Sequence, residues 1–107
     1  MAFDPEVAYQ ALIDAGETWA DAEAAADLLE ETRKSVLAKL VNEAEAGSMA
    51  AKESLALSDP TYRQFIEGMV QARKAANKAR VRYDSAKVLA ELRRSQESTR
   101  RAEMNLR

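Results

Sequence analysis

The chain contains only two prolines, and each of them follows an aspartate. Asp4-Pro5 and Asp59-Pro60 both combine a side chain that caps helices with the residue favoured at the first helical position. Only three glycines occur among the 107 residues, and no alternating or β-branched run indicates a strand. The sequence therefore predicts long helices that begin at these two prolines.

The first long helix is expected over residues 5–46. Its apolar residues recur at spacings of three and four, which is typical of a helix with one buried face. They are Trp19, Ala22, Ala26, Leu29, Val36, Leu40 and Ala44, with Leu37 and Val41 beside them. Gly16 interrupts the pattern, and Thr18 with Asp21 offers a local cap, so a kink or break there is the alternative to a continuous helix. We expect a continuous or mildly kinked helix whose C-terminus is marked by Gly47.

A short helix over residues 48–57, capped by Ser48, and a second long helix over residues 60–105 complete the prediction. The long helix carries a stripe with heptad-like spacing. The stripe consists of Tyr62, Phe65, Met69, Ala72, Ala76, Ala79, Tyr83, Ala86 and Ala90. Alanine at most of its central positions lets two helix backbones approach closely, and the stripe weakens after residue 90.

Two long helices joined by a short connector predict a single-domain, all-α fold, an elongated antiparallel hairpin with a short helix at the bend. Helices of nearly equal length place Trp19 near Ala86 or Leu89, and Leu40 near Phe65 or Met69. The predicted seam residues are Trp19, Ala26, Leu29, Leu40, Phe65, Met69, Ala76 and Tyr83. One side of a two-helix pair stays open unless another chain covers it, so we expect a homo-oligomer, most simply a dimer of four helices.

Charge is distributed unevenly along the chain. Residues 1–60 carry four basic and thirteen acidic side chains, whereas residues 61–107 carry twelve basic and five acidic ones. An antiparallel hairpin would set the acidic helix beside the basic one and would explain the split without any partner. The alternative is that the basic helix contacts nucleic acid, through Arg93, Arg94, Arg100, Arg101 and Arg107. Neutralising partners for the basic helix within the chain are Asp14, Glu17, Asp21, Glu23 and Asp27.

Several chemistries are disfavoured by composition. The chain has neither cysteine nor histidine, which removes thiolate and imidazole ligands and the commonest general base. No nucleophile turn, glycine-rich phosphate loop or calcium loop is present, and a two-helix hairpin is expected to lack a cleft of ligand size. We therefore expect no enzyme activity, no cofactor, no metal and no small-molecule substrate. No membrane span or secretory signal is expected either, which favours the cytoplasm.

The segment Asp59-Pro60-Thr61-Tyr62-Arg63-Gln64-Phe65-Ile66-Glu67-Gly68-Met69 and the Ala/Arg-rich run that follows it over residues 72–84 resemble small helical proteins encoded by bacteriophages and prophages. The resemblance covers residues 55–105. It implies a setting inside the host cell, alongside recombination or replication functions, and it assigns no catalytic residue.

Three functions are left open by the sequence. The first is a non-catalytic accessory protein that acts through helix–helix contacts with itself or with a protein partner. The second is a nucleic-acid-binding accessory protein that uses the basic helix. The third is an inhibitor whose acidic half, including Asp21, Glu23, Asp27, Glu30 and Glu31, imitates nucleic acid.

Overall fold

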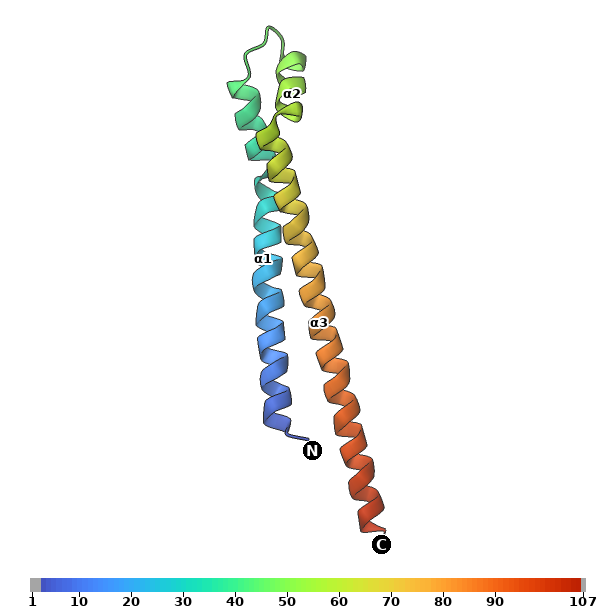
Figure 1. Ribbon diagram of the computed structural model, residues 1–107. Helices are drawn as coiled ribbons and strands as arrows, with labels where there is room; N and C mark the ends of the chain where they lie inside the picture. Colours follow the sequence, from blue (N-terminus) through green and yellow to red (C-terminus); the bar gives the residue numbers. More distant parts are fainter. Residues whose placement is uncertain (1–2, 107) are drawn as a thin grey trace. The chain divides into compact units, whose positions relative to one another are not determined.

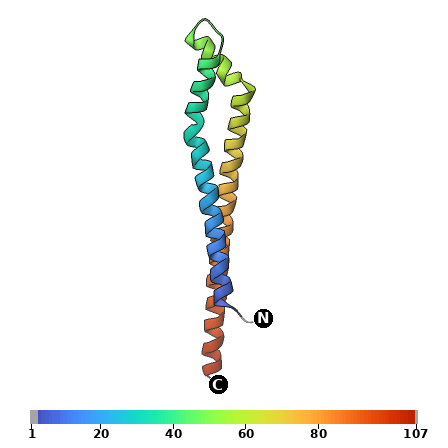
Figure 2. The same cartoon turned by 90° about the vertical axis from the view of Figure 1, so that its left-hand side faces the viewer.

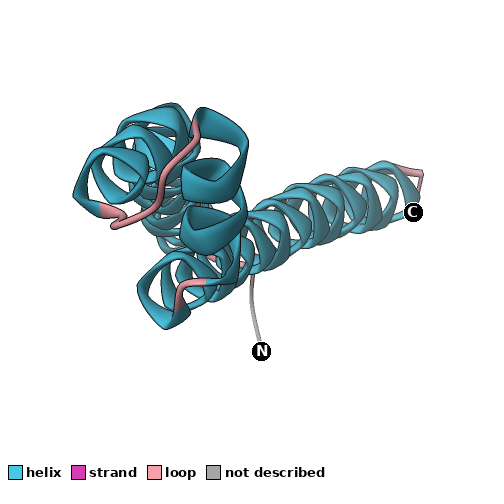
Figure 3. Cartoon of the chain, turned by 90° about the horizontal axis from the view of Figure 1, so that it is seen from above, coloured by secondary structure: helices cyan, strands magenta, loops and turns pink. Residues whose placement is uncertain are grey.

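The structure, a computed structural model, describes residues 3–106 and contains three helices in this range. Helix α1 covers Pro5–Glu43, α2 covers Met49–Ser58 and α3 covers Pro60–Asn105 (Figure 1). All other described residues form loops or turns, as the colouring by secondary structure shows (Figure 3). The prediction of an all-α helical hairpin with a short helix at the bend is therefore confirmed.

The predicted caps are present at the helix N-termini. The Asp4 carboxylate accepts a hydrogen bond from the Glu6 amide at 2.9 Å, and the Asp59 carboxylate accepts one from the Thr61 amide at 2.8 Å. Ser48 adopts an extended backbone and its hydroxyl accepts a hydrogen bond from the Ala51 amide. Each cap satisfies a backbone donor that lacks a partner within the helix.

Helix α1 ends at Glu43 rather than at residue 46, and Gly47 does not have the positive φ of a glycine C-cap. Its last turn closes through a hydrogen bond from the Ala44 amide to the Val41 carbonyl, a tighter pattern that often ends helices. The chain then has four residues in which to turn before Ser48 caps α2. That requirement explains the earlier end.

Helix α1 continues through Gly16 without a break. Thr18 does not cap a new helix, because its hydroxyl donates back to the Asp14 carbonyl at 2.9 Å, as threonines inside helices do. The ring of Tyr83 lies over Gly16, where a Cβ atom would come 3.5 Å from the ring. That distance is an ordinary contact, so the glycine gives the ring room without being required.

The chain forms two compact units. Unit 2 is residues 22–76 and contains the second half of α1, all of α2 and the beginning of α3. Within it, α1 and α3 run antiparallel side by side, as both Figure 1 and Figure 2 show. Its fully buried residues are the alanines Ala26, Ala56 and Ala76. Such small side chains let the helices pack closely, in agreement with the alanine-rich seam predicted from the sequence.

Unit 1 consists of residues 1–21 and 77–107, of which 3–21 and 77–106 are described. It joins the first half of α1 to the last two thirds of α3, and Ala79 is its buried alanine. The final turns of α3 extend past the beginning of α1 (Figure 1). No described helix has both the length and the low charge that crossing a membrane requires.

Candidate functional site

The eight predicted seam residues all lie on partly or fully buried faces of α1 and α3. Ala26 and Ala76 are fully buried in unit 2, and the other six are half-buried. The structure brings Trp19 and Tyr83 together in unit 1, with ring centroids 5.6 Å apart and ring planes tilted by 35°. Such tilted aromatic pairs are favourable contacts.

One contact across the seam reports directly on the register of the two helices. In unit 1, Trp19 packs against Tyr83, which lies one turn of α3 before Ala86, the residue near which the sequence placed it. In unit 2, Met69 borders the same surface hollow as Glu30 and Lys34, and the expected position of Leu40 near Phe65 or Met69 stays a prediction. Alanine side chains are too small to select one register by their shape, so the polar contacts of unit 2 are the second constraint on it.

The polar contacts of unit 2 centre on Arg73. Its Nη1 donates to Glu23 at 2.9 Å, its Nη2 to Asp27 at 2.7 Å, and its Nε and Nη2 both donate to Glu30 at 2.8 Å. The three acids occur four and three residues apart, so they share one face of α1. We call these four residues the Arg73 cluster. The Arg73 side chain is 28% exposed, whereas the three acidic side chains are 43–54% exposed, so water still reaches the cluster and screens its ion pairs.

The hydrogen bonds of the Arg73 cluster shift the pKa values of two residues, Glu30 and Arg73. The hydrogen bonds from Arg73 hold the pKa of Glu30 below its usual value, and those from Glu30, Asp27 and Glu23 raise the pKa of Arg73. Of the five acids expected to neutralise the basic helix, Glu23 and Asp27 do so through Arg73. Within the described residues, Asp14, Glu17 and Asp21 form no ion pair.

We expect the Arg73 cluster to make the stability of the protein fall in acid. A carboxyl whose pKa is lowered in the folded state stabilises the fold above its unfolded pKa, close to 4.5, and this contribution is lost as pH falls through the lower folded pKa. Thermal unfolding followed by circular dichroism at several pH values would measure the loss. Glu30→Gln should flatten the acid limb, whereas the control Glu31→Gln should keep it; equal profiles for the two variants would contradict the expectation.

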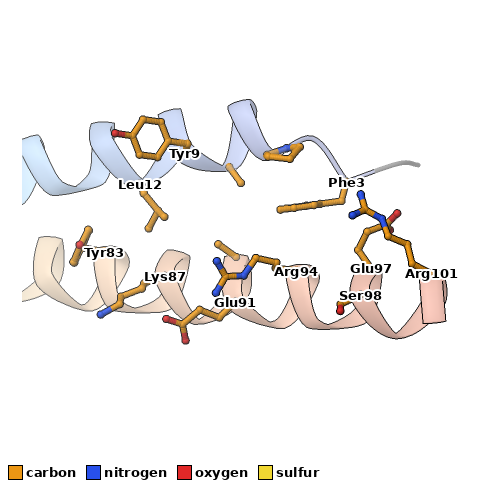
Figure 4. Close-up of a pocket in the computed structure, with 13 residues that line it drawn as sticks. Phe3, Tyr9, Leu12, Tyr83, Lys87, Glu91, Arg94, Glu97, Ser98 and Arg101 are labelled. Atoms are coloured by element: carbon orange, nitrogen blue, oxygen red, sulfur yellow. The ribbon is translucent and has the colours of Figure 1, made fainter. Parts of the chain in front are cut away.

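A groove lies between α1 and α3 in unit 1, with a volume of about 690 Å³ (Figure 4). Phe3 and Leu12 reach into it from the α1 side and Tyr83 from α3, whereas the Tyr9 ring points away from α3. The α3 wall follows one stripe of the helix, with Glu91 and Ser98 beside it. In chain order that stripe is Tyr83, Lys87, Ala90, Arg94, Glu97 and Arg101.

The groove contradicts the expectation that a hairpin lacks a cleft of ligand size. Two features create it: the facing residues Ala8 and Ala90 are small, and beyond Ala90 the inner stripe of α3 becomes charged at Arg94, Glu97 and Arg101. The stripe that weakens after residue 90 in the sequence therefore marks the place where the helices no longer close on each other. The groove is open to solvent and combines apolar walls with guanidinium groups.

The basic residues of the α3 tail are all exposed where the structure describes them. Arg94 and Arg101 line the groove seven residues apart, and Arg93 and Arg100 form a neighbouring row outside it. Arg107 lies outside the described residues. None of the four described arginines takes part in an ion pair within residues 3–106. The structure thus leaves these charges available, in contrast to Arg73.

The described part of the chain contains no metal-binding cluster. Residues 3–106 contain no cluster of three or more acidic, cysteine or histidine side chains that could hold a metal ion. The three acids of the Arg73 cluster instead bind a guanidinium group.

Comparisons with known proteins found no similar protein. No protein-family model, no curated protein and no solved structure matches this chain. Any function must therefore be argued from the residues and contacts described above.

Proposed function

We propose that this chain is a non-catalytic helical interaction protein that acts by helix–helix contact, in the first instance with further copies of itself. The observation that carries the proposal is the composition of the core. The buried apolar residues within the described range are four alanines, and no larger side chain is buried there. A chain that leaves its larger apolar side chains at the surface gains stability when another helix covers them.

The exposed apolar side chains support the same proposal. Val81, Val88 and Leu92 of α3 are each more than half exposed. Such side chains gain stability when a second helix removes them from water. Self-association can therefore bury apolar surface that a single copy leaves in solvent.

Light scattering after size exclusion, over a range of protein concentrations, tests the proposal. We expect a mass that rises above 11.8 kDa with concentration and persists at high salt, because apolar contacts are not screened. A monomeric mass at every concentration would contradict self-association. The setting in a phage or prophage, and a location inside the host cell, remain part of this proposal and rest on the resemblance of residues 55–105 alone.

Nucleic-acid binding is a second candidate function, favoured by the four exposed arginines of the α3 tail that lack ion pairs. Phosphate groups are the natural partners of such guanidinium groups. The third function, imitation of nucleic acid by the acidic half, is not favoured. Arg73 already engages Glu23, Asp27 and Glu30, so part of the acidic surface is neutralised within the chain.

If the α3 tail binds nucleic acid, the affinity for a short DNA duplex should fall steeply with salt. Each phosphate contact contributes about −0.9 to the slope of log K against log salt concentration. Arg93→Glu with Arg94→Glu should then reduce the slope by about 2 in fluorescence anisotropy titrations. The matched control changes the adjacent basic pair of unit 2, Arg33→Glu with Lys34→Glu, and should leave the slope unchanged. Equal slopes in the two double variants would exclude the tail as the binding surface.

A further inference from the structure

Helix α3 carries a second heptad stripe in unit 1 that no part of residues 3–106 covers. It runs at alternating spacings of four and three through Val81, Ser85, Val88, Leu92, Ser95, Thr99, Ala102 and Leu106. Every one of these residues is exposed; Val81 is 60% exposed and Leu92 is 56% exposed. We call this set the outer stripe. Its spacing is that of the a and d positions of a coiled coil.

The outer stripe faces away from the contact with α1. Tyr83 and Ala90, which face α1, occupy the f positions of the same heptads. An offset of two residues corresponds to about 160° around a helix, so Val81 and Val88 lie almost opposite Tyr83 and Ala90. A second helix can therefore pack along the outer stripe without displacing α1.

We propose that the outer stripe is a dimer interface, and that its occupant is the same segment of α3, residues 81–106, from a second copy running antiparallel. The inference rests on the proposed self-association and assigns it to one surface. Antiparallel coiled coils place a residues opposite d residues of the partner. If the two-fold axis of the dimer lies between residues 93 and 94, every residue of the outer stripe faces a residue of the same stripe in the second copy. The layers formed are Val81 with Leu106, Ser85 with Ala102, Val88 with Thr99, and Leu92 with Ser95.

Charge complementarity selects the antiparallel direction. In that register the flanking e positions set Arg82 opposite Glu103 of the second copy, twice by symmetry. The other flank sets Asp84 opposite Asn105 and Glu91 opposite Ser98, so no like charges meet across the seam. A parallel pairing would set Arg82 opposite Asn77 and Glu103 opposite Ser98, which provides no oppositely charged pair.

The outer stripe is long and its apolar residues are open to solvent. The paired segment of 26 residues is about 39 Å long, and Val81, Val88, Leu92 and Leu106 are each more than half exposed. The serines and threonine at Ser85, Ser95 and Thr99 make the seam less apolar than a leucine seam, so we expect a dimer that dissociates on dilution rather than an obligate one.

The first test replaces one exposed residue of the outer stripe. Leu92→Asp should raise the dimer dissociation constant at least about 100-fold, because the carboxylate would be buried in the dimer, while the circular dichroism of the dilute monomer stays unchanged. The control Gln96→Asp changes an adjacent flank position and should keep most of the dimer. If Leu92→Asp dimerises like the wild type, the outer stripe is not the interface, although self-association stands. If the wild type is monomeric throughout, both proposals fall.

The second test determines direction. Arg82→Glu and Glu103→Arg should each weaken the dimer, and the two changes combined should restore it. Within one chain these positions are 21 residues, or about 31 Å, apart along the helix, so they can couple only between copies. Two weakened single variants with no recovery in the double variant would contradict the antiparallel register.

Disulfide trapping gives an independent reading, since the chain has no cysteine of its own. Val88→Cys mixed with Thr99→Cys should form a mixed disulfide dimer in a glutathione buffer, while each variant alone should stay uncrosslinked. In the antiparallel dimer, equivalent positions 88 are about 16 Å apart, which is beyond disulfide reach. Rapid crosslinking of Val88→Cys with itself would indicate parallel helices and overturn the proposal.

Discussion

Ala76→Asp should unfold unit 2. Ala76 is fully buried where α3 packs against α1, so a larger polar group at this position would enter a closely packed seam. A carboxylate there would lose its hydration without gaining a partner, at an effective penalty of several kcal/mol. That penalty is a large fraction of the 5–15 kcal/mol by which domains are stable. We expect loss of the cooperative thermal transition and of most helical circular dichroism at 37 °C.

The neighbouring alanine provides the matched control. Ala75 belongs to the same turn of α3 but is exposed. Ala75→Asp introduces the same charge and the same helix propensity, so it should change the free energy of unfolding by no more than about 0.5–1 kcal/mol. Comparable destabilisation by both variants would show that helix propensity or net charge, and not burial in the alanine seam, causes the loss of stability in Ala76→Asp.

Trp19→Ala should have the second largest effect, and it should act on unit 1. The indole ring packs against Tyr83 and is half-buried, so its loss removes both apolar burial and a favourable aromatic pair. We expect a loss of about 2 kcal/mol in the free energy of unfolding, measured by urea denaturation with circular dichroism. In a double-mutant cycle with Tyr83→Ala, the two rings should couple by about 0.5–1.5 kcal/mol.

Tyr9 is the control for Trp19, because its ring belongs to the same helix in unit 1 but is 67% exposed. Tyr9→Ala should cost less than about 0.5 kcal/mol. Because Trp19 is the only tryptophan, its fluorescence in the wild type also reports on unit 1 specifically. A negligible coupling energy between Trp19 and Tyr83 would mean that the contact between the two rings contributes little to the free energy of unfolding.

The sequence pattern was sufficient to predict the helices and their buried faces. The aspartate–proline pairs mark the starts of α1 and α3, and the apolar spacing identifies the faces on which Trp19, Ala26 and Tyr83 are buried or half-buried. These features depend on local chemistry, namely capping and the helical period. They need no knowledge of which residue meets which across the seam.

The register and the groove were not predictable in the same way. Alanines on both helices fit one another at many offsets, so the pattern alone could not set Trp19 beside Tyr83. The groove depends on where the two helices separate, and only the charged residues at Arg94, Glu97 and Arg101 on the inner stripe indicated it. The Arg73 cluster did leave a signal, since Glu23, Asp27 and Glu30 recur at helical spacing opposite a basic helix.

The Arg73 cluster does more than add ion pairs, because it favours one register between the alanine-rich faces of α1 and α3 over the registers one heptad away. If α3 slid by one heptad along α1, Arg73 would face Gly16, Ala20 and Glu23 in one direction, or Glu30, Lys34 and Leu37 in the other. Either position offers a single carboxylate in place of three. The small side chains that permit close packing would tolerate such sliding. The ion pairs of Arg73 therefore favour one register of α3 against α1 over the registers one heptad away.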